Sequence, residues 1–310
     1  MMKLYSSLIL GISSFSTTSA WTSNASHLFR KSSAARSTEV KMSNDNSETS
    51  SSGFCTVIGG GRIGSLLNQG DNSVLLKRGD SISSDNEGTP IFIATRNDSL
   101  DGIIAECPPN RLKDLVFLQN GYLDDYLESK GLIDNTQSLL YLSVPALGVD
   151  PVDGITSVNP EGLTAATGVH AQALANLLGS LGLKCNVVNM EEYKPAMFEK
   201  LIWISTYMLV GTAKECNSVG QAGSDCKELV ETVVNELVAA VSAKEGITFP
   251  EGTMARLAAY TDVVADFPCG VKEFEWRNEY FYKLGDNACP THNTLLRECK
   301  EKGFISFDLP

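Results

Sequence analysis

The segment that most constrains the fold of this chain is a glycine-rich turn near residue 60. Residues 54–58, FCTVI, form a continuous apolar run with high β propensity, which is typical of a buried parallel strand. The next residues, GGGRIG, have the spacing G-x-G-x-x-G and lead into a segment of helical character. A strand, a glycine turn and a helix in this order predict a dinucleotide-binding unit. The alternative is a glycine-rich turn that binds no ligand.

Each glycine of the turn has an expected role. Gly59 permits the tight turn out of the strand, Gly61 lets the backbone approach a pyrophosphate, and Gly64 lets the helix pack closely on the sheet. Phosphate oxygens would then accept hydrogen bonds from backbone N–H groups at the start of the helix. The residues predicted to contact the cofactor are Gly59, Gly60, Gly61, Arg62, Ile63 and Gly64.

Two basic residues at the end of the second expected strand, 73–80, indicate which dinucleotide binds. An acidic residue is usual there when the cofactor has a free ribose 2′-hydroxyl, whereas this chain has Lys77 and Arg78 before Asp80. Two cations suit a ribose 2′-phosphate, and an arginine binds phosphate with two hydrogen bonds. The predicted cofactor is therefore NADP(H), and the alternative for these residues is a solvated basic turn.

The remaining pattern predicts an α/β fold, a Rossmann-type doubly wound parallel sheet followed by an all-helical second domain. Further β-prone runs occur at 90–98, 115–121 and 138–148. They alternate with short helical segments. Strand signals end at Glu191, and long apolar or amphipathic segments follow. We assign residues 53–190 to the NADP-binding domain and residues 191–310 to a helical domain with the substrate site.

The first 52 residues have the composition of a targeting leader. A lysine near the start, a short apolar stretch and Ser19-Ala20 resemble a secretory signal peptide. The basic, Ser-rich segment that follows has no acidic residue before Glu39 and resembles a transit peptide. This leader predicts a plastid address, with the secretory pathway or the mitochondrion as alternatives. The apolar stretch is too short to span a bilayer, so no membrane association is expected of the mature chain.

Charge and motif content limit the classes of partner and chemistry. With 25 basic and 37 acidic residues the formal charge is −12, which disfavours nucleic acid or an anionic membrane as the main partner. A small anionic ligand needs only local positive charge. The cysteines form no C-x-x-C pair, and no nucleophile motif stands beside His170 or His292. Neither a metal site nor a catalytic triad is therefore predicted. The sequence does not determine the oligomeric state.

Four short motifs occur in the order VIGGGRIG, LQNG, EKLIW and KEFEWRN. In this order they resemble the ketopantoate reductase family, remotely and over residues 54 to about 305. Members of that family have a Rossmann domain followed by a helical domain. The resemblance implies an NADPH-dependent reductase whose partner is a small 2-oxo acid, with ketopantoate as the named candidate.

The resemblance also implies roles for individual residues. The catalytic lysine falls on Lys200, and the substrate-binding glutamate, also a catalytic candidate, falls on Glu273. The asparagine beside nicotinamide and substrate falls on Asn120. A basic cofactor-binding residue at the end of a later strand falls on Arg96, and the hydroxylic residue that binds the substrate carboxylate falls on Thr261. The NADP-selecting arginine of the family falls on Arg78, in agreement with the charge argument above.

The chain departs from the family on the helix that carries Lys200. Polar asparagines follow the family's lysine at i+4 and i+8, but this chain has Ile204 and Met208 there. Ser205 or Thr206, from a neighbouring angle of the helix, is the predicted substitute for these substrate contacts. The departure leaves two alternatives open: a non-catalytic NADP-binding sensor or interaction protein, and a dehydrogenase of the same plan that acts on a more apolar substrate.

The residues around Lys200 support a catalytic role independently of the resemblance. The segment 196–213 is apolar almost all round, so a lysine in it is costly to bury, and burial lowers its pKa towards neutrality. An ammonium group there would stabilise charge on a carbonyl oxygen and deliver the proton. The alternative is a lysine that reaches solvent or pairs with Glu199. For Glu273 and Asn120 the alternatives are a solvated helix face and a simple turn former.

Overall fold

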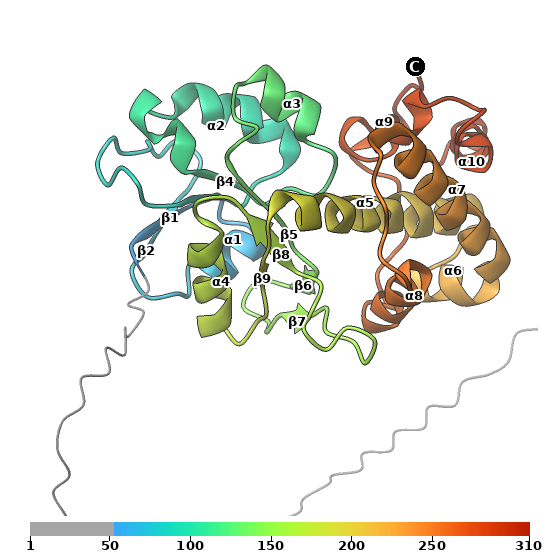
Figure 1. Ribbon diagram of the computed structural model, residues 1–310, viewed down its shortest axis with the longest axis horizontal. Coiled ribbons are helices and arrows are strands. Elements are labelled where there is room, and N and C mark those ends of the chain that lie inside the picture. The colour runs from blue at the N-terminus through green and yellow to red at the C-terminus, as the bar shows by residue number, and fades with distance from the viewer. Residues whose placement is uncertain (1–52) are drawn as a thin grey trace, which may run out of the picture. The chain divides into compact units, whose positions relative to one another are not determined.

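The computed structural model describes residues 53–310, and the leader lies outside the described residues. Its assignment to a plastid stays a prediction. The first half of the described chain forms a seven-stranded sheet with the strand order β2-β1-β3-β4-β5-β8-β9. Figure 1 shows this sheet with helices packed around it. The strands are β1 (Cys55–Ile58), β2 (Ser73–Leu76), β3 (Ile91–Ile93), β4 (Leu115–Phe117), β5 (Thr136–Leu139), β8 (Ala165–Thr167) and β9 (Asn186–Val187). β6 (Leu142–Ser143) and β7 (Val152–Asp153) form a separate hairpin.

The first five strands of this sheet are parallel. The chain passes from β1 outward to β2 and then returns to β3 on the other side of β1, so strand order reverses between β1 and β3. In an open α/β sheet, ligands bind in the crevice at this reversal, beyond the carboxyl ends of the strands. The predicted Rossmann-type plan is confirmed, and its ligand edge is formed by the residues that follow β1, β3, β4 and β5.

The structure differs from the predicted strands in one region. The apolar run 138–148 does not continue as one strand, because the chain leaves the sheet after Leu139 and Tyr141 instead accepts a hydrogen bond from Gly154 N. The next strand of the sheet, β8, runs antiparallel to β5. The sheet is therefore mixed at one edge, which the alternation of strands and helices did not predict.

Helices cover both faces of the sheet. α1 (Arg62–Leu67) and α4 (Ala171–Ser180) share one apolar cluster with the inward side chains of β1, β3 and β4, including Val57, Phe92 and Val116. α2 (Leu100–Glu106) and α3 (Asp124–Ser129) share another with Ile91, Ile93 and their neighbours. Alternate residues of β3 and β4 thus face opposite layers, as the period of two in a strand requires.

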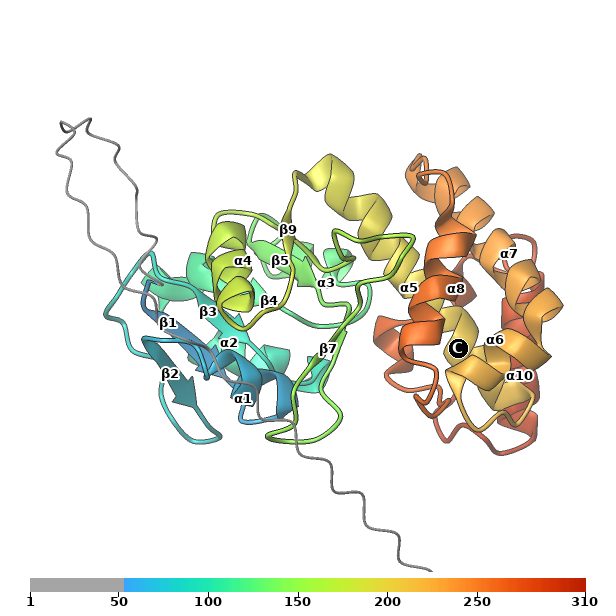
Figure 2. The ribbon, with the colours of Figure 1, turned by 90° about the horizontal axis from the view of Figure 1, so that it is seen from below.

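The second half is helical within residues 190–310, as predicted. α5 (Met190–Ala213) runs from the edge of the sheet into the group of helices (Figure 2). α7 (Lys227–Glu245), α10 (Pro290–Glu301), α6 (Val219–Asp225) and α8 (Thr253–Val263) pack around it, and α9 (Asn278–Lys283) lies beside α10. α5 is buried almost all round because helices surround its second half. Since α5 spans residues 190 and 191, the predicted domain division there stays a prediction.

α5 begins at Met190, before the apolar segment 196–213 from which the helix was predicted. Asn189 and Glu192 form a capping box, each side chain bonding to the other's backbone N–H. Pro195 therefore lies inside the helix, where it removes one hydrogen bond without ending it. No helix among residues 53–310 has both the length and the apolar composition needed to cross a membrane.

Candidate active site

The glycine turn has the geometry that its spacing predicts. Gly59 has a φ of +107°, and a Cβ there would lie 2.8 Å from the Ala94 carbonyl oxygen. A Cβ on Gly64 would lie 1.8 Å from the Gly59 carbonyl oxygen, so the helix start touches the turn itself. At Gly61, by contrast, a Cβ would meet no heavy atom within 4 Å, and at Gly60 only the Lys77 side chain at 3.9 Å. The outer glycines are required by packing, whereas the middle of the turn faces open space that suits a pyrophosphate.

Arg62 and Ile63 extend the turn into a cleft. Arg62 Nη1 donates hydrogen bonds to the carbonyl oxygens of Val144 (2.9 Å) and Pro145 (3.1 Å), which follow β6. The guanidinium therefore joins the start of α1 to the chain beyond β5. Both side chains line the cleft along the carboxyl edge of the sheet.

Lys77 and Arg78 are exposed immediately after β2. The Asp80 carboxylate accepts a hydrogen bond from the Lys77 backbone N–H at 2.7 Å, which closes the turn. Within residues 53–310, neither basic side chain forms an ion pair or a hydrogen bond. The acidic residue of this turn is thus held by the backbone, while both basic side chains face solvent.

The cleft brings together predicted residues from both halves of the chain. Its lining includes Arg62 from α1, Arg96 after β3, Asn120 after β4, and Glu273 and Arg277 around the 3₁₀ turn Phe274–Trp276. Arg96 is largely exposed and pairs with Asp98 at 3.0 Å. Four of these five residues were proposed from the sequence. Arg277 was not.

The loop after β4 is held in a defined position. The Gln119 side chain donates to the Ile93 carbonyl at 2.8 Å and the Thr95 carbonyl at 3.2 Å. The buried Asn97 side chain donates to the Asn120 carbonyl at 3.1 Å. These bonds tie the ends of β3 and β4 together and leave the Asn120 side chain exposed at the cleft.

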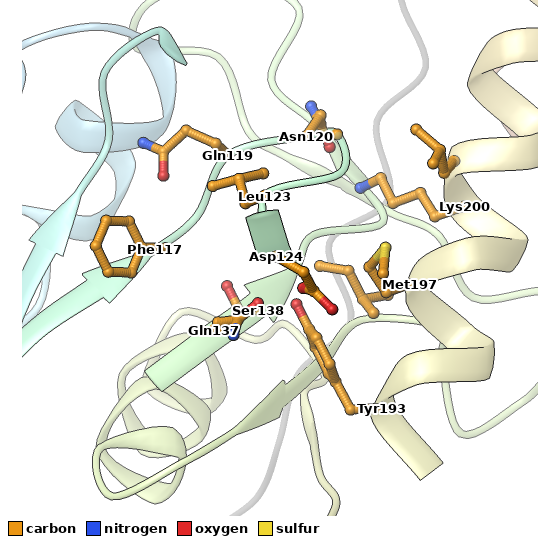
Figure 3. Close-up of a pocket in the computed structure, with 13 residues that line it drawn as sticks. Phe117, Gln119, Asn120, Leu123, Asp124, Gln137, Ser138, Tyr193, Met197 and Lys200 are labelled. Atoms are coloured by element: carbon orange, nitrogen blue, oxygen red, sulfur yellow. The ribbon is translucent and has the colours of Figure 1, made fainter. Parts of the chain in front are cut away.

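Lys200 lies across the same loop, as Figure 3 shows, with its side chain extending from α5 towards Asn120. Only 6% of the residue is exposed. Its Nζ donates to the carbonyl of Leu140, which follows β5, and lies 4.8 Å from the centre of the Tyr141 ring. Gln119 and Asn120 line both the cleft and the small cavity beside Lys200, so the two spaces adjoin.

The environment of Lys200 lowers its pKa to about 7, chiefly because burial disfavours the charged form and secondarily because the positive charge of Arg277 is near. Glu199, the alternative partner, is instead engaged by Arg256 through bonds of 2.9 and 2.7 Å. The lysine therefore neither reaches solvent nor pairs with Glu199. A buried amine with a pKa near neutrality gives and takes a proton readily at physiological pH.

Glu273 and Arg277 form an ion pair of 2.5 Å between Oε2 and Nη2. Glu273 has a φ of 53°, in the left-handed region that residues other than glycine seldom adopt and that often marks functional sites. The sequence signal for Arg277 was present but weak, since it lies four residues after Glu273 in KEFEWRN. Spacing alone does not distinguish a cleft residue from a solvated helix face.

Two predicted substrate contacts lie away from the cleft. Thr261 is buried between α8 and α5, where its hydroxyl accepts from Trp203 Nε1 and donates to the Leu257 carbonyl, both at 2.8 Å. Ser205 is fully buried on a different face of α5 from Lys200. Ile204 belongs to the hydrophobic core, and the partly buried Met208 packs against it. The sequence could not indicate this, because it depends on how α8 is rotated against α5.

No family model and no curated protein matches the chain. Solved structures do match. The ketopantoate reductase of Ralstonia eutropha is 17% identical, with a TM-score of 0.57, over 80% of this chain and 100% of that one. The 2-dehydropantoate 2-reductase of Methylococcus capsulatus is 15% identical, with a TM-score of 0.58, over 82% and 98%. A D-mandelate dehydrogenase solved with NADH is 16% identical, with a TM-score of 0.56, over 81% and 100%. The chain therefore has the fold of the ketopantoate reductases, as its sequence motifs indicated.

Proposed function

We propose that this protein is an NADPH-dependent oxidoreductase that reduces small 2-oxo acids. The observation that carries the proposal is Lys200, a buried amine with its pKa lowered to about 7, beside a cleft that reaches the glycine turn. Ketopantoate reductases and D-mandelate dehydrogenase, which share the fold, are named for 2-oxo and 2-hydroxy acids. That shared chemistry supports the same class of substrate here.

The residues of the cleft can each contribute to the reduction. The chemistry that a reduced nicotinamide supplies when bound is a hydride for the carbonyl carbon, which leaves negative charge on the carbonyl oxygen. The Lys200 ammonium has three N–H groups and uses one on Leu140, so the others can bind this oxygen. Lys200 then transfers a proton to the oxygen and regains one from water, which completes the hydroxy acid. Asn120 supplies an exposed amide that can orient the substrate.

Lys77 and Arg78 are proposed to select NADPH over NADH. Replacing both with glutamine is expected to raise the Kd for NADPH about 10- to 100-fold, because charged hydrogen bonds to the 2′-phosphate are lost. The Kd for NADH should not change, and calorimetry measures both. Lys227→Gln removes an exposed charge from α7 and serves as the control. An equal rise in the Kd for NADPH and for NADH would show that Lys77 and Arg78 attract either dinucleotide and do not select NADPH.

A cofactor-consumption screen tests the proposed function itself. Purified protein is mixed with NADPH or NADH and a panel of aliphatic and aryl 2-oxo acids that includes ketopantoate, and absorbance and hydroxy acid are followed together. Oxidation of NADPH with matching formation of one hydroxy acid is the expected result. Binding of NADPH without turnover of any compound would refute the reductase and favour a non-catalytic NADP-binding protein.

A further inference from the structure

The position of Arg277 is fixed by a contact between the two halves of the chain. Gly121 has a φ of +132°, and a Cβ there would lie 2.3 Å from the Trp276 carbonyl oxygen. The same oxygen accepts a hydrogen bond of 2.7 Å from Tyr122 N. The loop after β4 and the turn before α9 therefore touch backbone to backbone. Arg277 is the next residue, so its side chain enters the cleft beside Asn120.

The Arg277 guanidinium is incompletely bonded. Its Nη2 donates to Glu273, but within residues 53–310 its buried Nε has no hydrogen-bond partner. Both side chains of the ion pair are largely buried, since only 16% of the Arg277 side chain and 22% of the Glu273 side chain are exposed to solvent. A buried charged donor without an acceptor is costly, and such a group in a native protein requires a partner such as a water molecule, an ion or a ligand. The ligand must supply an acceptor, and a carboxylate matches a guanidinium with two parallel hydrogen bonds.

The charges of the cleft also favour an anion. Arg62, Arg96 and Arg277 line it, whereas Glu273 is the acidic residue of its lining and is paired with Arg277. The positive charge of Arg277 is close enough to Lys200 to lower the pKa of the amine by repulsion. An anion that touches both would relieve this repulsion. Thr261 is the residue that the family resemblance assigns to the substrate carboxylate. Its hydroxyl instead accepts a hydrogen bond from Trp203 in the core.

We propose that Arg277 is the carboxylate-binding residue of the substrate site, holding the acid group of a 2-oxo acid while Lys200 faces the adjacent carbonyl oxygen. The inference rests on the proposed function and adds the reason why the substrate is an acid. The two polar groups of a 2-oxo acid lie on neighbouring carbons, so neighbouring cations from α5 and from the turn before α9 match them. Arg277 thereby determines specificity, and Lys200 performs the proton transfer.

The experiment compares a 2-oxo acid with its own methyl ester, using the full chain and NADPH. Wild type should strongly prefer the acid. Arg277→Gln should lower kcat/KM for the acid by about 30- to 1,000-fold, the usual cost of removing one partner from a buried charge pair, and leave the ester within a few-fold. Arg277→Lys, which keeps the charge, should recover part of the preference. A wild type that reduces acid and ester equally well would overturn the inference without any variant.

Two further readouts separate substrate binding from a purely structural role. Glu273→Gln breaks the ion pair but keeps the guanidinium, so it should retain binding of oxamate, an unreactive 2-oxo acid analogue without a hydroxyl group. Arg277→Gln should lose this binding in calorimetry. Equal loss in both variants would show that Arg277 acts only through Glu273. Oxamate binding that needs Arg277, in a protein that reduces nothing, would refute the reductase yet support the carboxylate site.

The pH profile gives an independent test. Around Lys200 the titratable and charged groups are Arg277, the Tyr141 ring, and Tyr193 and Asp124, which line its cavity. Removing the positive charge of Arg277 should let Lys200 keep its proton to higher pH. The alkaline limb of kcat/KM is therefore expected to move upward in Arg277→Gln and to stay near the wild-type position in Arg277→Lys. If the alkaline limb of kcat/KM stays at its wild-type pH in Arg277→Gln, the proposed position of Arg277 beside Lys200 is wrong.

Discussion

Lys200→Met is expected to lower kcat for 2-oxo acid reduction by about 10²- to 10⁴-fold, the usual contribution of a general acid, while NADPH binds as before. Methionine keeps the apolar stem of the side chain and removes the ammonium. Replacing a buried charge with an apolar group of similar volume is often neutral or stabilising, so Tm should not fall. Steady-state kinetics, calorimetry with NADPH and thermal unfolding measure the three effects.

The pH dependence of the wild type follows from the same residue. Lys200 must be protonated to act as an acid, so kcat/KM for reduction should be constant below its pKa of about 7 and fall about tenfold per pH unit above it. In the oxidative direction the neutral amine is the active form, and the rate should rise through the same pKa. This dependence should be absent from the residual activity of Lys200→Met.

Lys214→Met is the matched control for Lys200→Met. Lys214 lies at the end of the same helix, but 41% of its side chain is exposed and it pairs at 3.9 Å with Glu298, whose side chain is 39% exposed. Its replacement should leave kcat within about twofold, because surface pairs contribute little. Normal turnover by Lys200→Met would show that the proton comes from another group.

Gly64→Ala is expected to destabilise the protein by about 3 kcal/mol or more and to abolish NADPH binding. The added Cβ would lie 1.8 Å from the Gly59 carbonyl oxygen and 3.3 Å from the Ala94 Cβ. Because the first obstacle is backbone, α1 must move away from the turn, and the cofactor-binding surface moves with it. Chemical denaturation measures the free energy of unfolding, and calorimetry measures the binding.

Two other glycines separate the effect on packing from the effect on the cofactor. Gly61 has φ −74° and ψ −175°, which alanine adopts readily, and its Cβ would meet open space. Gly61→Ala should therefore cost less than about 1 kcal/mol of stability but raise the Kd for NADPH at least about tenfold, because it fills the approach to the pyrophosphate. Gly179→Ala on α4, where a Cβ also meets nothing, should leave NADPH binding unchanged and raise stability by about 0.4–1 kcal/mol, as alanine does inside a helix. Unchanged NADPH binding by Gly61→Ala would place the pyrophosphate elsewhere.

Local patterns were sufficient to predict much of the fold. The run 54–58, the glycine spacing and the apolar segment of α5 each depend on residues close together in the chain, and the structure has a strand, a turn and a helix at these places. The antiparallel pairing of β8 with β5 was missed, because 136–139 and 165–167 meet only after a long excursion that includes the hairpin β6–β7. The three-residue strands also carry little periodic signal.

For the candidate site, too, some features could be predicted from local sequence patterns and others could not. Short segments were enough to predict the βα unit with its glycines, the basic pair after β2 and a buried lysine on α5, because helix period, turn conformation and charge are local properties. Which side chains meet at the site depends instead on the tertiary structure. It directed Thr261 into the core and Arg277 into the cleft, because the rotation of one helix against another and the contact of Gly121 with Trp276 depend on packing between distant parts of the chain.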